Sequence, residues 1–386
     1  MSCADFSSCM VSVLGVPPQA LFGQLLLGLI NGSFYAMLSL GLAVIFGLLN
    51  IVNFAHGAQY MMGAFGAYFL LNNSYVSIGY WPALILSPLI CGLFGVLLER
   101  NLISQLNVKS KTRSLTVFGA FFLILIALAG SNLASTLGLG NRVPDLATAF
   151  GYRLDPALAY GIAAIAALLI TTVLANTGVL ETHASDEHGD HLYGLLLTFG
   201  LAIVIQGLFV NQYGSSGLPY TIPAELSGGK NLGFMFLPIY RGWVVIASLA
   251  VCLATWATIE KTKLGAYLRA ATENPTLLQA FGVNVPLLIT FTYGLGVALA
   301  GLAGVLAAPI YSVNPNMGAD LIIVVFAVVV IGGMGSILGS IVTGFGLGIV
   351  EGLTKVFYPQ ASSTVIFVIM AIVLLIKPAG LFGKAA

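Results

Sequence analysis

Polar side chains in the first third of the chain have the types and the spacing to bind a small polar solute. Asn31, Tyr35 and Ser39 lie four residues apart, and Gln24 lies seven residues before Asn31, so that one helical face carries all four. Amide and hydroxyl groups are costly to bury in a membrane and are candidates for function there by default. We therefore predict that Asn31 and Tyr35 line a translocation pathway.

A second polar group follows directly, in the sequence Ile-Val-Asn-Phe-Ala-His-Gly-Ala-Gln-Tyr of residues 51–60. A backbone interrupted by Asn53 and Gly57 is tolerated at membrane depth only where it lines protein or a cavity. Asn53, His56 and Gln59 are accordingly predicted to continue the pathway. The alternative is that Asn53 and His56 cap helix ends and tie loops together.

Ionisable side chains are nearly absent from the middle of the apolar segments, and Asp320 and Glu351 lie near predicted segment ends. A transporter driven by protons or sodium normally holds its coupling ion with buried carboxylates or unwound helices. An ion channel uses rings of carbonyl or charged groups. A path of neutral amides, hydroxyls and tyrosines instead favours a small polar or zwitterionic solute.

Other candidates for chemistry carry little weight. Three of the four histidines lie beside four carboxylates within residues 181–191, but this spacing matches no recognised zinc geometry, and charged runs usually face water. His56 has no acid nearby in sequence, and no G-x-x-x-x-G-K-[ST] phosphate loop occurs. We expect no metal site, no cofactor bound by this chain and no enzymatic activity.

The composition indicates what must hold these residues. Of 386 residues, 59% are hydrophobic and 7% are charged, and the mean hydropathy is +1.01, whereas soluble domains carry about 25% charged residues. These values exclude a water-soluble enzyme, and a net charge of +1 offers no field to attract nucleic acid. At about 20 apolar residues per span, we predict a single all-α domain, residues 1–386, with about nine to eleven transmembrane helices, some of them broken.

Apolar segments alternate with charges along the chain and cover residues 19–49, 55–72, 78–98, 115–138, 157–180, 192–211, 241–259, 285–310, 319–353 and 362–376. The segment 319–353 is too long for one span, so we predict that it breaks near residues 332–335 and passes twice. Nine of the fourteen basic residues cluster within 100–113, 261–269 and 377–384. Because loops rich in Lys and Arg stay cytoplasmic, the N-terminus is predicted outside and the C-terminus in the cytoplasm.

Small residues recur at every fourth position in three of these segments. Gly28 and Gly32 form one pair, and longer series run from Gly296 to Ala308 and from Ser336 to Gly352. Small residues at this spacing let helix backbones approach closely in a membrane. We predict that all three series mark helix contacts rather than chemistry.

The loop at residues 261–284 contains signals for two short helices. They meet at Glu273, Asn274 and Pro275, where Asn274 is placed to cap the second helix, Pro275 fits its first position and Gly282 ends it. The second helix carries Leu277, Leu278 and Phe281 beside Thr276 and Gln279. A helix too short to be stable alone is expected to dock in a groove on a partner. The alternative is a helix lying in the lipid interface.

Four motifs resemble those of permease subunits from ABC importers of the branched-chain amino acid (hydrophobic amino acid uptake) family. Residues 264–306 are similar to the family's EAA loop and the helix that follows it. The other motifs are residues 28–63, with Asn-Gly-Ser-Phe-Tyr-Ala at 31–36 and Val-Asn-Phe-Ala-His-Gly at 52–57, residues 330–336 and residues 377–383. They occur in the family's order and cover most of the chain outside 107–188.

The resemblance implies a transport subunit of the bacterial cytoplasmic (inner) membrane, coupled to ATP hydrolysis through the loop 261–284. The residues that would contact an ATPase are Arg269, Glu273, Asn274, Pro275, Thr276, Leu277, Leu278, Phe281 and Gly282. The implied partners are a second homologous permease, two ATP-binding cassette ATPases that hydrolyse the ATP, an extracytoplasmic substrate-binding protein and membrane lipid. The solute stays open among branched-chain amino acids, urea or amides, and aromatic or dicarboxylic acids. The alternative function is a facilitative channel for a small neutral solute such as urea.

One segment departs from the family's pattern. Residues 107–188 intervene between two stretches that follow each other closely in the family, and they contain two apolar segments. Two added spans preserve the orientation of everything downstream. We therefore predict an inserted helical hairpin.

Overall fold

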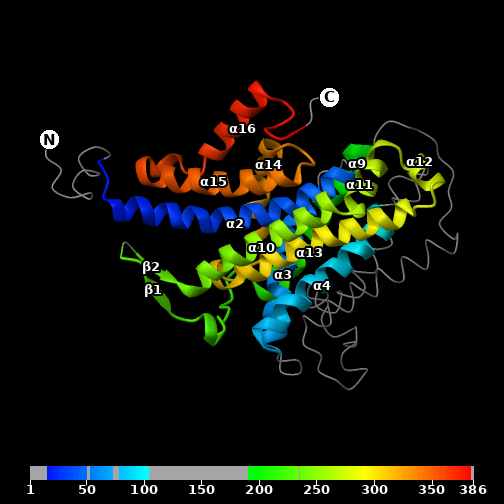
Figure 1. Ribbon diagram of the computed structural model, residues 1–386. Helices are drawn as coiled ribbons and strands as arrows, with labels where there is room; N and C mark the ends of the chain where they lie inside the picture. Colours follow the sequence, from blue (N-terminus) through cyan, green and yellow to red (C-terminus); the bar gives the residue numbers. More distant parts are fainter. Residues whose placement is uncertain (1–14, 50–52, 73–77, 104–189, 234, 384–386) are drawn as a thin grey trace, which may run out of the picture.

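The computed structural model describes residues 15–49, 53–72, 78–103, 190–233 and 235–383. Within these ranges the chain is mostly helical (Figure 1), which confirms the all-α prediction, and six helices are long and apolar enough to cross a membrane. These six are α2 (Pro18–Leu49), α4 (Tyr80–Leu98), α9 (Asp190–Tyr213), α10 (Ile239–Lys261), α13 (Val285–Tyr311) and α15 (Ile337–Phe357). Three more helices are shorter or more polar: α3 (Ala55–Asn72), α14 (Met317–Gly332) and α16 (Val365–Ile376). The predicted hairpin of residues 107–188 lies outside the described ranges.

Short elements mark the two ends of the bundle. At one end, a 3-10 turn (η2, Ala224–Leu226) precedes strands β1 (Gly229–Asn231) and β2 (Phe236–Pro238), which pair antiparallel. A π-helical turn (η1, Glu99–Ile103) extends α4, and a second 3-10 turn (η3, Pro359–Ala361) leads into α16. Figure 1 shows the strands and the start of α2 at one end of the bundle, and α11 (Lys263–Glu273) and α12 (Pro275–Ala280) at the other.

Helix α2 runs through the middle of the bundle and contacts α10, α13, α14 and α15 (Figure 1). Every residue from Gly32 to Ile45 is buried. Gly28 and Gly32 lie against the backbone of α15, and a Cβ atom at Gly32 would come 3.0 Å from the Cα atom of Phe345. The small residues of α2 and α15 therefore serve the close helix contact that their spacing predicts.

The series in α13 makes a second set of close contacts. A Cβ atom at Gly296 would meet the side chain of Ile45 on α2, and one at Gly304 would meet the backbone of Tyr60 on α3. Helix α13 thus packs against both earlier helices along its buried face. Because lipid gives no hydrophobic drive for association, close packing of this kind contributes to holding the helices together.

The long apolar segment breaks where predicted. Helix α14 ends at Gly332 and α15 begins at Ile337, and between them Gly333 and Gly335 have φ values of 103° and 83°. The hydroxyl of Ser336 accepts the Gly339 N–H at 3.1 Å and so caps α15. The C-terminal motif folds onto this turn: the Leu381 and Phe382 N–H groups donate to Ile331 and Gly332 carbonyls at 2.8 and 3.0 Å. Two motifs about 50 residues apart in sequence are thus one structural unit.

Candidate functional site

The loop 261–284 forms the two short helices that its residues predict. Asn274 ends α11 and caps α12, and its side-chain oxygen accepts the Leu277 N–H at 2.9 Å. Gly282 has a φ of 83°, in the left-handed region that glycine favours. Asn284 then caps α13 by accepting the Leu287 N–H at 3.1 Å. Two side-chain caps and a glycine therefore define the path of this loop from local interactions alone.

The predicted coupling residues do not all face the same way. Leu278 is buried in a small cluster with Ala271 and Val285, so it anchors α12 to its own chain rather than presenting a docking surface. Leu277 and Phe281 are 56% and 78% exposed. The remaining exposed members of the predicted set in this loop are Arg269, Glu273, Asn274, Pro275, Thr276 and Gly282. The apolar surface open to a partner is therefore Leu277 with Phe281.

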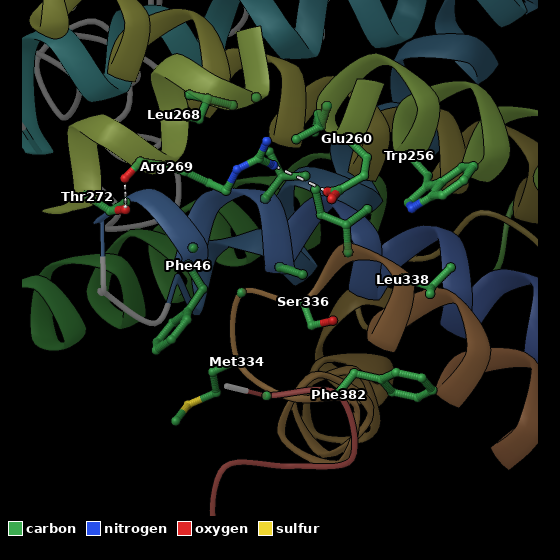
Figure 2. Close-up of a pocket in the computed structure, with 18 residues that line it drawn as sticks. Phe46, Trp256, Glu260, Leu268, Arg269, Thr272, Met334, Ser336, Leu338 and Phe382 are labelled. Atoms are coloured by element: carbon green, nitrogen blue, oxygen red, sulfur yellow. Dashed lines mark hydrogen bonds and ion pairs between the residues drawn. The ribbon is translucent and has the colours of Figure 1, made fainter. Parts of the chain in front are cut away.

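Arg269 lies apart from that surface, in the wall of a cavity at the same end of the bundle. Its Nη1 atom is 3.3 Å from Glu260 Oε2 of α10. The cavity has a volume of about 840 Å³, and α2, α10, α11, the turn between α14 and α15 and the C-terminal segment contribute to its walls. In Figure 2 the ion pair lies on one side, and Phe46, Ser336 and Phe382 lie on the other. Nothing in the sequence spacing indicates this cavity, because its walls come from five separate segments.

The predicted pathway residues separate into two groups. On the half of the bundle nearer the β-strands, the hydroxyl of Tyr311 donates to Asn31 Oδ1 at 2.8 Å. The hydroxyl of Tyr35 donates to Glu351 Oε2 at 2.8 Å, and Lys355 Nζ lies 2.5 Å from Glu351 Oε1. Asn31 and Tyr35 thus belong to a polar cluster that joins α2 to α13 and α15.

The position of Glu351 corrects the sequence interpretation. We placed it near the end of a span, but it is buried inside α15, which runs on to Phe357. A new helix begins after the break at residues 333–336. It extends beyond the end of the predicted apolar segment 319–353, so Glu351 is not at the end of the helix. The bundle therefore does contain a buried carboxylate, and it is paired with both a cation and a hydroxyl.

The second group joins the start of α3 to α13. Asn53 Nδ2 donates to the Tyr293 hydroxyl at 3.0 Å and to Gln59 Oε1 at 3.3 Å, and Gln59 Nε2 donates to the same hydroxyl at 3.2 Å. Asn53 Oδ1 also accepts the Ala55 N–H at 3.0 Å. His56 Nε2 lies 3.0 Å from the Leu38 carbonyl oxygen. These contacts correspond to the alternative in which Asn53 and His56 hold the helix start in place.

Glu99 is a buried acid that the sequence analysis did not single out. It lies in η1, just beyond α4, with 3% of its surface exposed, and the Thr290 hydroxyl of α13 donates to its carboxylate. Burial raises the pKa of the Glu99 carboxyl group, while the Thr290 hydrogen bond and the charge of Arg100 partly offset the rise. Glu99 therefore ties the end of α4 to the first turns of α13, close to the coupling loop.

A bundle with six helices long and apolar enough to cross a membrane, and with a capped, exposed short helix at one end, is a polytopic membrane protein. The family described as "Branched-chain amino acid transport system / permease component" matches residues 24–375, and this chain belongs to that family. It is a permease subunit of an ABC importer. The family resemblance is thereby confirmed.

Similar proteins cover nearly the whole chain. The high-affinity branched-chain amino acid transport system permease proteins BraD of Pseudomonas aeruginosa and LivH of Escherichia coli are each 24% identical over 366 residues, which is 94% of this chain and 95% of each relative. A probable branched-chain amino acid transport permease protein LivH of Methanocaldococcus jannaschii is 28% identical over 231 residues, or 55% of this chain and 70% of the relative. No solved structure matches the chain. The family is one of transport permeases rather than enzymes, and the facilitative urea channel receives no support from these matches.

Proposed function

We propose that this chain forms the translocation pathway for branched-chain amino acids in the cytoplasmic membrane of a bacterium. It pairs with a second permease and with two ATPases, and it receives solute from an extracytoplasmic binding protein. Relatives that match it along almost their full length are described as branched-chain amino acid permeases, which supports the solute class. The chain carries no phosphate-loop motif, so ATP is hydrolysed by the partner subunits and no cofactor is bound here.

The observation that carries this proposal is the exposed face of α12. A six-residue helix with Leu277 and Phe281 in solvent gains little from its own hydrogen bonds, because isolated helices this short are unstable in water. Its Asn274 cap and the left-handed Gly282 that follows it hold it in shape before any partner arrives. Leu277 and Phe281 form a preformed apolar ridge at the end of the membrane bundle. Such a ridge is suited to a groove on an ATPase, in the manner of other helices that bind in apolar grooves.

The same geometry supports an orientation. Helix α11 and the C-terminal motif 377–383 lie at one end of the bundle, since Arg269 and Phe382 line the same cavity, and α11 leads directly into α12. The start of α2 lies at the other end (Figure 1). If the ATPases bind α12, the C-terminus faces the cytoplasm and the start of α2 faces outside, in agreement with the positions of the basic clusters.

The polar cluster around Glu351 is the part of the bundle best suited to the solute. A zwitterionic amino acid carries one ammonium and one carboxylate group, and the cluster offers Glu351 and Lys355 with the hydroxyls of Tyr35 and Tyr311 and the amide of Asn31. Lys355 is partly exposed and Glu351 is nearly buried, so the cluster is accessible from one side. We assign Asn31 and Tyr35 to the pathway and Asn53 and Gln59 to the support of α3.

Asn31→Ala and Asn53→Ala are expected to behave differently. Asn53→Ala should lower the stability of the permease by about 1–2 kcal/mol through lost interhelical hydrogen bonds, while uptake per folded protein stays unchanged. Asn31→Ala should lower uptake per folded protein several-fold with a smaller loss of stability, because the Asn31–Tyr311 hydrogen bond is exposed whereas those of Asn53 are buried. Thermal melting followed by size-exclusion chromatography measures the first quantity, and solute uptake measures the second. Asn72→Ala is the matched control, because Asn72 is exposed and donates to the Tyr68 carbonyl one turn earlier within the same helix. Reduced uptake at Asn53 without any loss of stability would restore that residue to the pathway.

The proposed function is tested in the organism that makes this chain. Deleting its gene is expected to reduce uptake of radiolabelled L-leucine at least about tenfold, and the wild-type gene should restore it. Isoleucine and valine should compete with leucine, while urea should not, and depletion of cellular ATP should stop uptake. Mass spectrometry of the complex purified through a tag on this chain should identify a second permease and ATPase subunits. Uptake that persists without ATP would overturn the importer assignment, and competition by urea alone would overturn the solute.

A further inference from the structure

The cavity beside α11 is lined by charged and apolar side chains that the proposed coupling through α12 does not involve. Among its lining residues the charged ones are Arg269 and Glu260, one cation and one anion. The other walls are mostly apolar or aromatic, and they include Trp256, Phe46, Leu338 and Phe382. Its volume of about 840 Å³ lies within the range of about 300–1,000 Å³ typical of small-molecule sites. A cavity with one charge of each sign above apolar walls matches an amino acid with an apolar side chain.

Arg269 and Glu260 can each exchange the other for a charged group of a ligand. Arg269 Nη1 and Glu260 Oε2 are 3.3 Å apart, and the two side chains are 50% and 54% exposed. An exposed pair of this kind contributes little to stability. An arginine fork binds a carboxylate through two parallel hydrogen bonds, and a carboxylate such as Glu260 accepts charge-assisted hydrogen bonds from an ammonium group. A zwitterion inserted between the two side chains would satisfy both charges and lose only a weak contact.

The opposite wall adds a second favourable feature for a carboxylate. Helix α15 begins at Ile337, and Ser336, Ile337 and Leu338 all line the cavity. The first turn of a helix of this length carries a partial positive charge. Figure 2 shows Ser336 and Leu338 across the cavity from Glu260 and Arg269. A ligand carboxylate is therefore attracted from both walls, while Glu260 supplies the place for the ammonium group.

From this arrangement we propose that the cavity is a cytoplasmic binding site for an apolar α-amino acid and that its occupation inhibits ATP-driven import. The inference rests on the proposed function, because the ligand is the solute that import delivers to this side of the membrane. The residues that line the cavity include none of the Glu351 cluster. The cavity takes the accumulated product rather than the incoming solute.

The inhibition follows from which elements the cavity joins. Arg269 and Glu260 belong to α11 and α10, and α11 leads directly into α12 through Asn274. Phe46, Leu338 and Phe382 belong to the central helix, to α15 and to the C-terminal segment. A ligand that bonds to the first wall and packs on the second holds α11 against the bundle. The bound ligand therefore favours the state in which α12 does not move with the ATPases over the state in which it does. A ligand shifts an equilibrium between two states by the difference between its affinities for them.

The site is tested with the complete complex in lipid nanodiscs, without binding protein. Tritiated L-leucine should bind at equilibrium and reduce ATP hydrolysis. Leucinamide, which lacks the carboxylate, and 4-methylpentanoate, which lacks the ammonium group, should each compete at least about tenfold more weakly, as expected for the loss of charge-assisted hydrogen bonds. Glu260→Gln and the cavity-filling Leu338→Trp should weaken leucine binding by a similar factor and should relieve the inhibition. Glu225→Gln, in η2 at the far end of the bundle, is the matched control and should change neither.

The possible results separate this inference from the proposed function. If host cells need this chain for leucine uptake but leucine neither binds to the complex nor inhibits ATP hydrolysis, the cavity site is wrong and the importer stands. Leucine binding that Glu260→Gln and Leu338→Trp leave unchanged would belong to another site and would also overturn the inference. If leucinamide and 4-methylpentanoate bind as well as leucine, the inference that the site recognises a zwitterion is wrong. If leucine binds under the stated charge rules in a complex that imports another solute, the amino acid site stands, while the proposed solute and inhibition by the imported product are wrong.

Discussion

Gly348→Val is expected to abolish folded permease, whereas Gly346→Val on the same helix is expected to leave it folded. A Cβ atom at Gly348 would fall on the backbone of Gly28 and Gly32, and backbone atoms cannot rotate away as a side chain can. Helix α2 and α15 would have to separate along their whole contact, which is the largest between any two helices in the described part of the chain. Overpacking costs about 1–3 kcal/mol where neighbouring side chains adjust, so this change should cost more.

The control at Gly346 isolates the contact from the intrinsic effect of valine in a helix. A Cβ atom at Gly346 meets nothing within 4 Å, and it lies only two positions from Gly348 in α15. The measurement is the amount of monodisperse permease recovered after heating in mild detergent. Equal recovery of the two variants would show that the α2–α15 contact does not determine stability.

Gly282→Val is expected to uncouple the permease while the membrane bundle remains intact. Gly282 has a φ of 83°, and a β-branched residue in that region is a genuine outlier, with a strain of about 1–3 kcal/mol. The chain can relieve this strain by changing the path between α12 and α13, which would displace the Leu277 and Phe281 surface. We expect leucine uptake to fall at least about tenfold, while the folded permease is recovered in normal amount.

Gly228→Val provides a control with the same backbone strain at the other end of the bundle. Gly228 has a φ of 90°, and a Cβ atom there meets nothing within 4 Å, as at Gly282. Its loop precedes β1, far from α12 (Figure 1). If Gly228→Val lowers uptake as much as Gly282→Val does, the effect is general strain and not a loss of coupling.

Direct contact with the ATPase is measured by photo-crosslinking. A photoreactive phenylalanine analogue at Phe281, which is 78% exposed, should crosslink to an ATPase subunit, and the same analogue at Phe236, which is 63% exposed in β2, should not. The two positions lie at opposite ends of the bundle, so the pair also tests the orientation. A crosslink from Phe236 and none from Phe281 would reverse the assignment of the cytoplasmic face.

Local signals in the sequence determined the helix boundaries and the loop. The apolar segments predicted at 55–72 and 285–310 correspond closely to α3 and α13, the break was expected at the glycines where α14 ends, and the cap at Asn274 forms as predicted. Each of these features depends on backbone groups within about four residues of one another. The family match covers residues 24–375, a range that includes three of the four motifs.

Tertiary structure alone decided which polar groups meet and which apolar side chains are buried. Tyr35 and Glu351 are 316 positions apart and share a hydrogen bond, Leu278 turns inward while Leu277 next to it faces out, and the cavity around Arg269 has walls from five segments. The physical reason is the solvent. In water an apolar stripe marks the buried face of a helix, but lipid is as apolar as the protein interior, so residues facing lipid and residues facing other helices look alike in the sequence.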